Sequence, residues 1–149
     1  MRTLNDRKTF ILKWNPAISS VNLEDWDFWV AKKDFLVPNW SVYEHEKVDI
    51  GDEWYMLRVG EGVTGIVGHG TFCSNPQKAG DWSGQGKVRY YSELCILDLM
   101  PHSEPMITTE ILAKCIPNCD WRGGHSGVKL PNIDIERLDN LRSNYYDQH

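Results

Sequence analysis

Residues 53–72 read EWYMLRVGEGVTGIVGHGTF, and this stretch decides which kind of fold the chain can adopt. An apolar run over residues 53–59 leads into a glycine-rich connection and then into a second apolar run over residues 66–72. Short runs rich in aromatic and β-branched residues, separated by glycines, favour two strands of a hairpin over a helix. The sequence therefore predicts a β-hairpin with a longer loop near the middle of the chain.

The connection of this hairpin contains Gly60-x-Gly62-x-x-Gly65, which is the glycine spacing of a dinucleotide-binding loop. That fingerprint requires a helix after the last glycine, because the N-terminus of the helix receives the pyrophosphate. Here a predicted strand follows instead of a helix. We therefore interpret the glycines as a hairpin connection, and the sequence predicts no cofactor.

Further elements are predicted on both sides of the hairpin. A strand over residues 9–14 stops at Asn15-Pro16, and a helix follows Ser19 and Ser20, begins near Leu23 and ends before Pro38. Downstream we expect an exposed loop over residues 73–86, strand structure over 87–100, and helices over 108–114 and 133–146. These elements predict one α+β domain over residues 1–149, a mostly antiparallel β-barrel flanked by short helices.

Composition and charge restrict the class of protein. The chain has 149 residues and a net charge of −5, which argues against a protein that coats nucleic acid through many lysines and arginines. Residues 1–20 nevertheless carry four basic side chains against one acidic one, so a local phosphate-facing surface is compatible with the sequence. No apolar run is long enough to span a bilayer, so we expect a cytoplasmic protein without a membrane partner.

The four cysteines do not reach the density of a disulfide scaffold, and we expect them to be reduced. Cys73 and Cys95 lie in or beside predicted strands and are interpreted as small core residues. Cys115, Cys119 and His125 could supply three zinc ligands, but Cys-x3-Cys is a loose spacing and no fourth ligand is assigned. The sequence therefore predicts no metal site.

Seven tryptophans outnumber the four phenylalanines, and they are the first functional indication. Trp26, Trp29 and Trp54 fall within predicted elements and are expected in the core. Four others stand at the ends of elements or in polar loops: Trp14, Trp40, Trp82 and Trp121. Loops at one rim of a barrel can converge, and several indole rings there would form a stacking pocket for a nucleobase.

Polar side chains near these tryptophans complete the predicted site. Amide, hydroxyl and imidazole groups both donate and accept hydrogen bonds, so Asn15, Ser41, His125 and Ser126 are candidates for reading the edge of a base. The candidates for phosphate contacts are Lys13, Arg89 and Arg122. Stacking on such rings would supply roughly 1–3 kcal/mol per base.

Two other functions compete with this interpretation. Exposed tryptophans could instead anchor a protein partner, because tryptophan is a preferred interface residue. A small hydrolase or metal-dependent nuclease is the second alternative. Gly124-His125-Ser126-Gly127-Val128 approaches the nucleophile-elbow motif of hydrolases, but Val128 stands where that motif requires glycine, and no acid partner can be placed. We therefore expect a binding module and not an enzyme.

Several short motifs together resemble the EVE domain of the PUA-like superfamily, to which ASCH and YTH domains also belong. From Ile11 to about Leu130 they are, in order, LKWNP (12–16), WSVY (40–43), GIVG (65–68), NPQKAGD (75–81) and GHSGV (124–128). Trp14 and Asn15 replace the serine and glutamate that are common in the family, and the loops around Trp82 and His125 differ from it. The chain thus resembles a divergent subgroup.

This resemblance implies a PUA-like barrel that holds a flipped or single-stranded nucleobase, often a modified one. Such domains read a base without chemistry of their own, and some are attached to enzymes that restrict modified DNA. The implied partners are DNA or RNA carrying a modified base, together with a restriction or RNA-processing protein.

Overall fold

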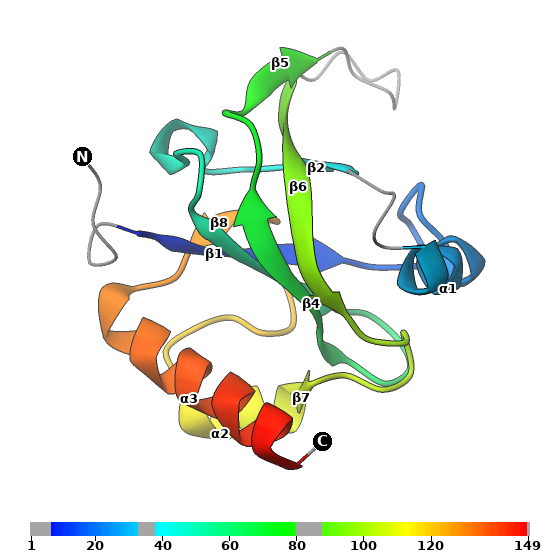
Figure 1. Ribbon diagram of the computed structural model, residues 1–149, viewed down its shortest axis with the longest axis vertical. Coiled ribbons are helices and arrows are strands. Elements are labelled where there is room, and N and C mark those ends of the chain that lie inside the picture. The colour runs from blue at the N-terminus through cyan, green and yellow to red at the C-terminus, as the bar shows by residue number, and fades with distance from the viewer. Residues whose placement is uncertain (1–6, 33–37, 80–87, 149) are drawn as a thin grey trace.

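A computed structural model describes residues 7–32, 38–79 and 88–148 (Figure 1). In chain order its elements are β1 (Thr9–Trp14), α1 (Leu23–Lys32), β2 (Asn39–Ser41), the 3-10 helix η3 (His45–Lys47), β3 (Glu53–Arg58), β4 (Gly65–Phe72), β5 (Gln77–Ala79), β6 (Arg89–Leu99), β7 (Ile107–Thr108), α2 (Thr109–Cys115), β8 (Val128–Lys129) and α3 (Asn132–Gln148). The strand at 9–14, the central hairpin and the three helices are therefore confirmed.

The described strands form one eight-stranded sheet in which β2, β6, β4, β3, β1 and β8 are neighbours in that order. Strand β5 pairs with β6 and β7 pairs with β4. The pairing is antiparallel except between β1 and β3, which run parallel. The sheet is strongly curled, so β4 and β6 run steeply across β1 (Figure 1). The α+β class and the mostly antiparallel, barrel-like sheet are confirmed.

Both faces of the central strands are buried, which explains why their sequences are apolar runs and not strict alternations. In β1, Phe10 and Leu12 belong to a core cluster beside α1, whereas Ile11 belongs to a second cluster beside α2 and α3. In β3, Met56 and Leu57 divide between the two clusters in the same way. Helix α1 thus lies on one side of the sheet and the helices α2 and α3 on the other (Figure 1).

The N-terminus of α1 is capped by Asn22. The Asn22 side chain accepts a hydrogen bond from the Asp25 backbone N–H at 2.9 Å, and the Asp25 carboxylate accepts one from the Asn22 N–H at 3.0 Å. This reciprocal pair is a capping box, and it starts the helix at Leu23. Ser19 and Ser20 precede the cap.

The cysteine prediction is wrong for one pair, because Cys73 and Cys95 are joined by a disulfide. Thr71 of β4 pairs with Cys95 of β6, and Cys73 lies two residues after Thr71, where its N–H donates to the Glu93 carbonyl at 2.9 Å, so the two cysteines lie diagonally across neighbouring strands. Their Cα atoms are 5.5 Å apart, which is within the usual range for a disulfide.

Cys115 and Cys119 are free thiols. The segment after Cys73 also contains a short strand, β5, where only a loop was predicted.

His69 lies in β4 with a buried side chain and takes part in a polar network beneath α3. Its Nε2 atom is 3.3 Å from a Glu53 carboxylate oxygen and 2.7 Å from the Arg142 guanidinium. The hydrogen bond with His69 holds the pKa of the Glu53 carboxyl below its usual value of 4.5. His69 is thus a satisfied core residue that connects the sheet to α3.

The stability of a Trp14 variant tests whether an indole ring at the end of a strand supports the core. The Trp14 side chain is 1% exposed, so replacing it by alanine removes a large part of the cluster beside α1. We expect Trp14→Ala to lower the free energy of unfolding by about 3–5 kcal/mol, measured by urea denaturation. Phe28→Ala is the matched control, because Phe28 is 57% exposed and its loss should cost less than about 0.5 kcal/mol. Equal losses in both variants would contradict the buried position of Trp14.

The Glu53 carboxyl should make stability depend on pH at the acidic end. Since its pKa is lower in the folded than in the unfolded chain, ionised Glu53 stabilises the fold above pH 4.5, and this contribution is lost as the pH falls through the folded-state pKa. We expect the difference in unfolding free energy between the parent protein and Glu53→Gln to shrink over that range. A difference that stays constant with pH would contradict this assignment.

Candidate functional site

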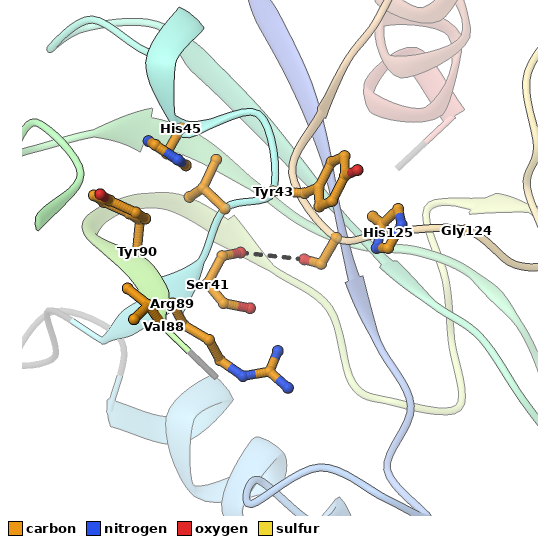
Figure 2. A pocket seen from close by; sticks show the side chains of 10 residues that line it. Ser41, Tyr43, His45, Val88, Arg89, Tyr90, Gly124 and His125 are labelled. Carbon is orange, nitrogen blue, oxygen red and sulfur yellow. Dashed lines mark hydrogen bonds between the residues drawn. The ribbon is translucent and has the colours of Figure 1, made fainter. Parts of the chain in front are cut away.

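A pocket of about 430 Å³ lies where β2, the start of β6 and the loop before β8 meet (Figure 2). This volume lies within the range of about 300–1,000 Å³ that is typical of small-ligand sites. The pocket is lined by Ser41, Val42, Tyr43, His45, Val88, Arg89, Tyr90, Gly124, His125 and Ser126. Three segments that are far apart in the sequence thus contribute to one site.

The loop that carries His125 is held in place by main-chain hydrogen bonds. The Tyr43 N–H donates to the Ser126 carbonyl at 2.8 Å, and the Gly127 N–H donates to the Ile11 carbonyl at the same distance. The Ser126 hydroxyl accepts a hydrogen bond from the Lys13 N–H at 2.9 Å. The loop is therefore fixed between β1 and the segment that follows β2.

Gly127 permits this close approach. Its φ angle is +89°, which is favourable for glycine and costly for other residues. A Cβ atom at this position would also lie 2.6 Å from the Cα atom of Val42. A side chain at residue 127 would therefore push the loop away from β2 and open the pocket.

Two stacked pairs of aromatic rings lie at the pocket. The rings of Tyr43 and His125 are 3.7 Å apart with planes inclined by 3°, and those of His45 and Tyr90 are 3.6 Å apart with planes inclined by 10°. The two pairs flank the segment that carries Ser41 (Figure 2). Tyr43 is 59% exposed, so this pair presents a flat, accessible ring surface.

Arg89 supplies positive charge to the same pocket. Its Nε atom is buried and has no hydrogen-bond partner among the described residues. A buried polar atom without a hydrogen-bond partner is costly. A ligand oxygen or nitrogen that accepted a hydrogen bond from this N–H would recover part of that cost. The pocket thus combines ring faces with an arginine whose enclosed Nε–H has no partner among the described residues.

A second cavity of about 380 Å³ adjoins the pocket and shares Gly124 and His125 with it. Ile11 and Trp121 contribute to its largely apolar lining. Lys13 also lines it and donates hydrogen bonds from Nζ to the carbonyls of Asp120, at 3.1 Å, and Gly123. Burial lowers the pKa of the Lys13 ammonium below its usual value. Lys13 therefore holds the 120–123 loop and places a positive charge beside the pocket.

The structure brings together only part of the predicted site. Four of the predicted residues line the pocket, namely Ser41, Arg89, His125 and Ser126. Asn15 lines a different cavity near α1 and accepts a hydrogen bond from the Ala17 N–H. Arg122 is exposed and lines none of the three cavities described here. Trp82 lies outside the described residues.

The expectation of exposed indole rings is wrong for the other three tryptophans. Trp14, Trp40 and Trp121 are 1%, 8% and 3% exposed, and each belongs to a core cluster. The Nε1 atom of each donates to a backbone carbonyl: Val21 for Trp14, Lys13 for Trp40 and Ile116 for Trp121. Because the polar atom is satisfied inside the protein, an indole at the end of an element can be buried without cost.

Three aromatic residues of the pocket are not among the predicted site residues: Tyr43, His45 and Tyr90. Tyr43 and His45 closely follow Trp40-Ser41, and Tyr90 follows Arg89 in a basic segment, so a search for any aromatic residue beside the candidate polar groups would have found them. Their pairing as stacked rings depends on contacts between distant segments.

Three other features of the described residues bear on function: a free thiol, the potential metal ligands and the hydropathy of the helices. The free thiol of Cys119 lies 3.7 Å from the Asp134 carboxylate, and burial raises the pKa of this thiol to about 11. Within residues 7–32, 38–79 and 88–148, no three side chains of the metal-ligating types gather into a site. None of the helices in these ranges has the length and apolar composition that crossing a bilayer would require.

No protein-family model and no curated protein matches this sequence. Among solved structures, the chain is similar to the Mmi1 YTH domain in complex with RNA, with a TM-score of 0.57 and 13% identity over 95% of this chain and 81% of the other. Two further Mmi1 YTH domain structures match at TM-scores of 0.55 and 0.54, each 13% identical, covering 96% and 95% of this chain and 79% and 99% of theirs.

This likeness shows the fold, which is that of YTH domains. The PUA-like fold that the sequence motifs resemble agrees with these structural neighbours. Membership of the EVE group in particular stays a prediction.

The pocket should depend on the absence of a side chain at residue 127. We expect Gly127→Ala to lower the free energy of unfolding by about 1–3 kcal/mol and to change the amide signals of Tyr43 and Ser126, because the added Cβ atom overlaps Val42. Gly123→Ala is the control: a Cβ atom there would meet its nearest neighbour, Asp120, at an ordinary 3.4 Å. If both variants are equally stable in urea, the loop does not need this close approach.

Proposed function

We propose that the protein is a binding module for single-stranded RNA that accepts one nucleobase at the pocket between the Tyr43–His125 and His45–Tyr90 ring pairs. The observation that carries the proposal is the presence of two flat ring pairs and an arginine whose Nε atom has no partner among the described residues, all within one pocket. Unpaired RNA bases are commonly recognised by stacking on aromatic rings together with hydrogen bonds to their edges.

Stacking is the main expected source of affinity. A tyrosine and an imidazole that already lie parallel lose little freedom when a base stacks on them, so more of the stacking energy becomes binding energy. This contribution is about 1–3 kcal/mol per base in proteins that bind single strands. The Ser41 and Ser126 groups at the pocket would select the edge of the base through hydrogen bonds.

Local positive charge supports a nucleic-acid ligand on a protein whose net charge is −5. Arg89 lines the pocket, and Lys13 and Lys129 line the adjoining cavity. A few cations of this kind position a strand without creating strong sequence-independent binding, because that mode needs many phosphate contacts. The similar Mmi1 YTH domain was solved in complex with RNA, which favours RNA over DNA as the partner here.

A modified base is the finer part of the proposal. A pocket of about 430 Å³ leaves room for an added methyl group, and a ring face beside it would remove that group from water. We propose that the module prefers a methylated base and acts beside an RNA-processing protein, without chemistry of its own.

The alternative of a protein partner anchored by exposed tryptophans loses its basis for most of these residues. Trp14, Trp26, Trp40, Trp54 and Trp121 are all buried. Trp29 packs against the cluster beside α1 and is only partly buried, and Trp82 is outside the described residues. No described observation favours a hydrolase or a nuclease over a binding module.

Tyr43→Ala tests the stacking surface. We expect it to weaken binding of short single-stranded RNA by about 1–3 kcal/mol while leaving stability nearly unchanged, since the ring is largely exposed. Fluorescence anisotropy with labelled RNAs, each with one central base methylated or unmodified, measures the affinity. DNA strands of the same sequence distinguish the two nucleic acids.

Tyr146→Ala is the matched control, because Tyr146 is also exposed but lies on α3, away from the pocket. Arg89→Gln should in addition reduce the slope of log affinity against log salt by about one, whereas Arg137→Gln on α3 should not change it. Binding that is equally strong in the Tyr43 and Tyr146 variants would overturn the proposed site, and no binding of any strand by the parent protein would overturn the function.

A further inference from the structure

A third cavity, of about 760 Å³, is lined by residues from the end of β1, the β3–β4 connection and the beginning of α1. It shares no lining residue with the proposed base pocket. Arg58, Asn15, Gly62 and the first turn of α1 contribute to its wall. The cavity therefore has to be explained separately.

Arg58 is a buried cation for which residues 7–32, 38–79 and 88–148 supply no anionic partner. The residue is 7% exposed, and its Nη1 and Nη2 atoms donate to the carbonyls of His102, at 2.7 Å, and Glu61, at 3.4 Å. These bonds use two of the five guanidinium N–H groups, and Nε has no partner among the described residues. No carboxylate of the described chain lies within ion-pair distance of Arg58.

Such a group is expensive to bury. Burial lowers the pKa of the Arg58 guanidinium, but arginine stays charged in proteins, so the cost cannot be avoided by losing the proton. Buried charges are normally paired, because desolvation without a counter-charge costs several kcal/mol. An anion bound in the cavity beside Arg58 would supply the missing partner.

Glycines let the β3–β4 connection pack closely against Arg58 and Asn15 at the wall of the cavity. Gly60 and Gly62 have φ angles of +93° and +89°. A Cβ atom at Gly62 would lie 2.8 Å from Nη2 of Arg58, and one at Gly60 would lie 2.7 Å from Oδ1 of Asn15. Main chain without side chains therefore contacts the guanidinium on this side, and an anion would reach Arg58 from the side that lines the cavity.

Helix α1 adds a second favourable feature. The capping residue Asn22 and the first helical residues, Leu23 and Glu24, line the cavity, so the positive end of the helix dipole faces the same space as Arg58. Backbone N–H groups at a helix N-terminus are common ligands for phosphate. Glu24 and Glu61 are exposed residues of the lining whose carboxylates oppose binding of an anion. The Asp25 carboxylate already accepts the Asn22 N–H, so an anion at the helix N-terminus would have to use the Leu23 and Glu24 amides.

We propose that this cavity is a phosphate-binding site in which Arg58 and the N-terminus of α1 hold one phosphate group. The ligand class is a phosphate monoester or diester, supplied either by a small phosphorylated molecule or by the backbone of a nucleic acid. The site is independent of the base pocket and needs none of its residues.

The direct test is a titration of the parent protein followed by the NMR signals of the Arg58 Nε–H and of the Leu23 and Glu24 amides. The probes are inorganic phosphate, a nucleoside 5′-monophosphate, and short single-stranded RNA with and without a 5′-phosphate, with sodium chloride at equal ionic strength as the reference. We expect saturable shifts of all three signals with at least one phosphate probe and not with chloride. Shifts with the monophosphate alone identify a small ligand, and equal shifts with both RNAs identify an internal phosphodiester.

Two variants strengthen the test. Arg58→Lys keeps the charge but loses the forked donor geometry, and we expect about tenfold weaker phosphate binding. Glu61→Gln removes an exposed carboxylate while leaving its backbone carbonyl, and we expect about twofold tighter binding. Identical shifts with chloride and phosphate, or unchanged affinity in both variants, would overturn the site. Tyr43→Ala should leave phosphate binding unaffected, so failure of the base pocket and failure of this site are separately visible.

Discussion

The pocket depends on one close main-chain approach, in which the segment around Gly127 lies between β1 and the residues that follow β2. Hydrogen bonds from Tyr43 and Gly127 fix this segment on both sides, and the absence of a Cβ atom at Gly127 allows the two main chains to meet. The Tyr43 N–H donates to the carbonyl of Ser126, the residue after His125, and this bond brings the Tyr43 and His125 rings side by side. The ring surface and the pocket therefore share one structural cause.

Burial of the tryptophans has a consequence for where ligands can be recognised. Trp14 stacks on Trp26 with ring centres 4.5 Å apart, and Trp40 packs in the same core cluster. These rings pack at the end of β1, next to Lys13 on one side and to Asn15 of the cavity near Arg58 on the other. Smaller, more exposed aromatic residues then provide the accessible surface.

Local patterns were sufficient for much of the fold and for part of the site. The strand at 9–14, the central hairpin and the amphipathic helix at the end of the chain follow from periodicity and turn residues, which are properties of neighbouring positions. The parallel pairing of β1 with β3 could not be predicted in this way, because the partners are separated by α1, β2 and η3 and no short-range signal encodes the pairing. The same holds for the Cys73–Cys95 disulfide.

The sequence by itself determined the α+β class, the boundaries of the main elements and the polar candidates Ser41, Arg89, His125 and Ser126, because residue type and spacing act locally. Only the tertiary structure decided which aromatic rings face solvent and which face the core. A tryptophan at the end of a strand can turn either way, and the outcome depends on whether a distant carbonyl is in place to accept its N–H, as the Lys13 carbonyl does for Trp40. Long-range packing thus determined which aromatic rings are exposed at the pocket and which are buried in the core.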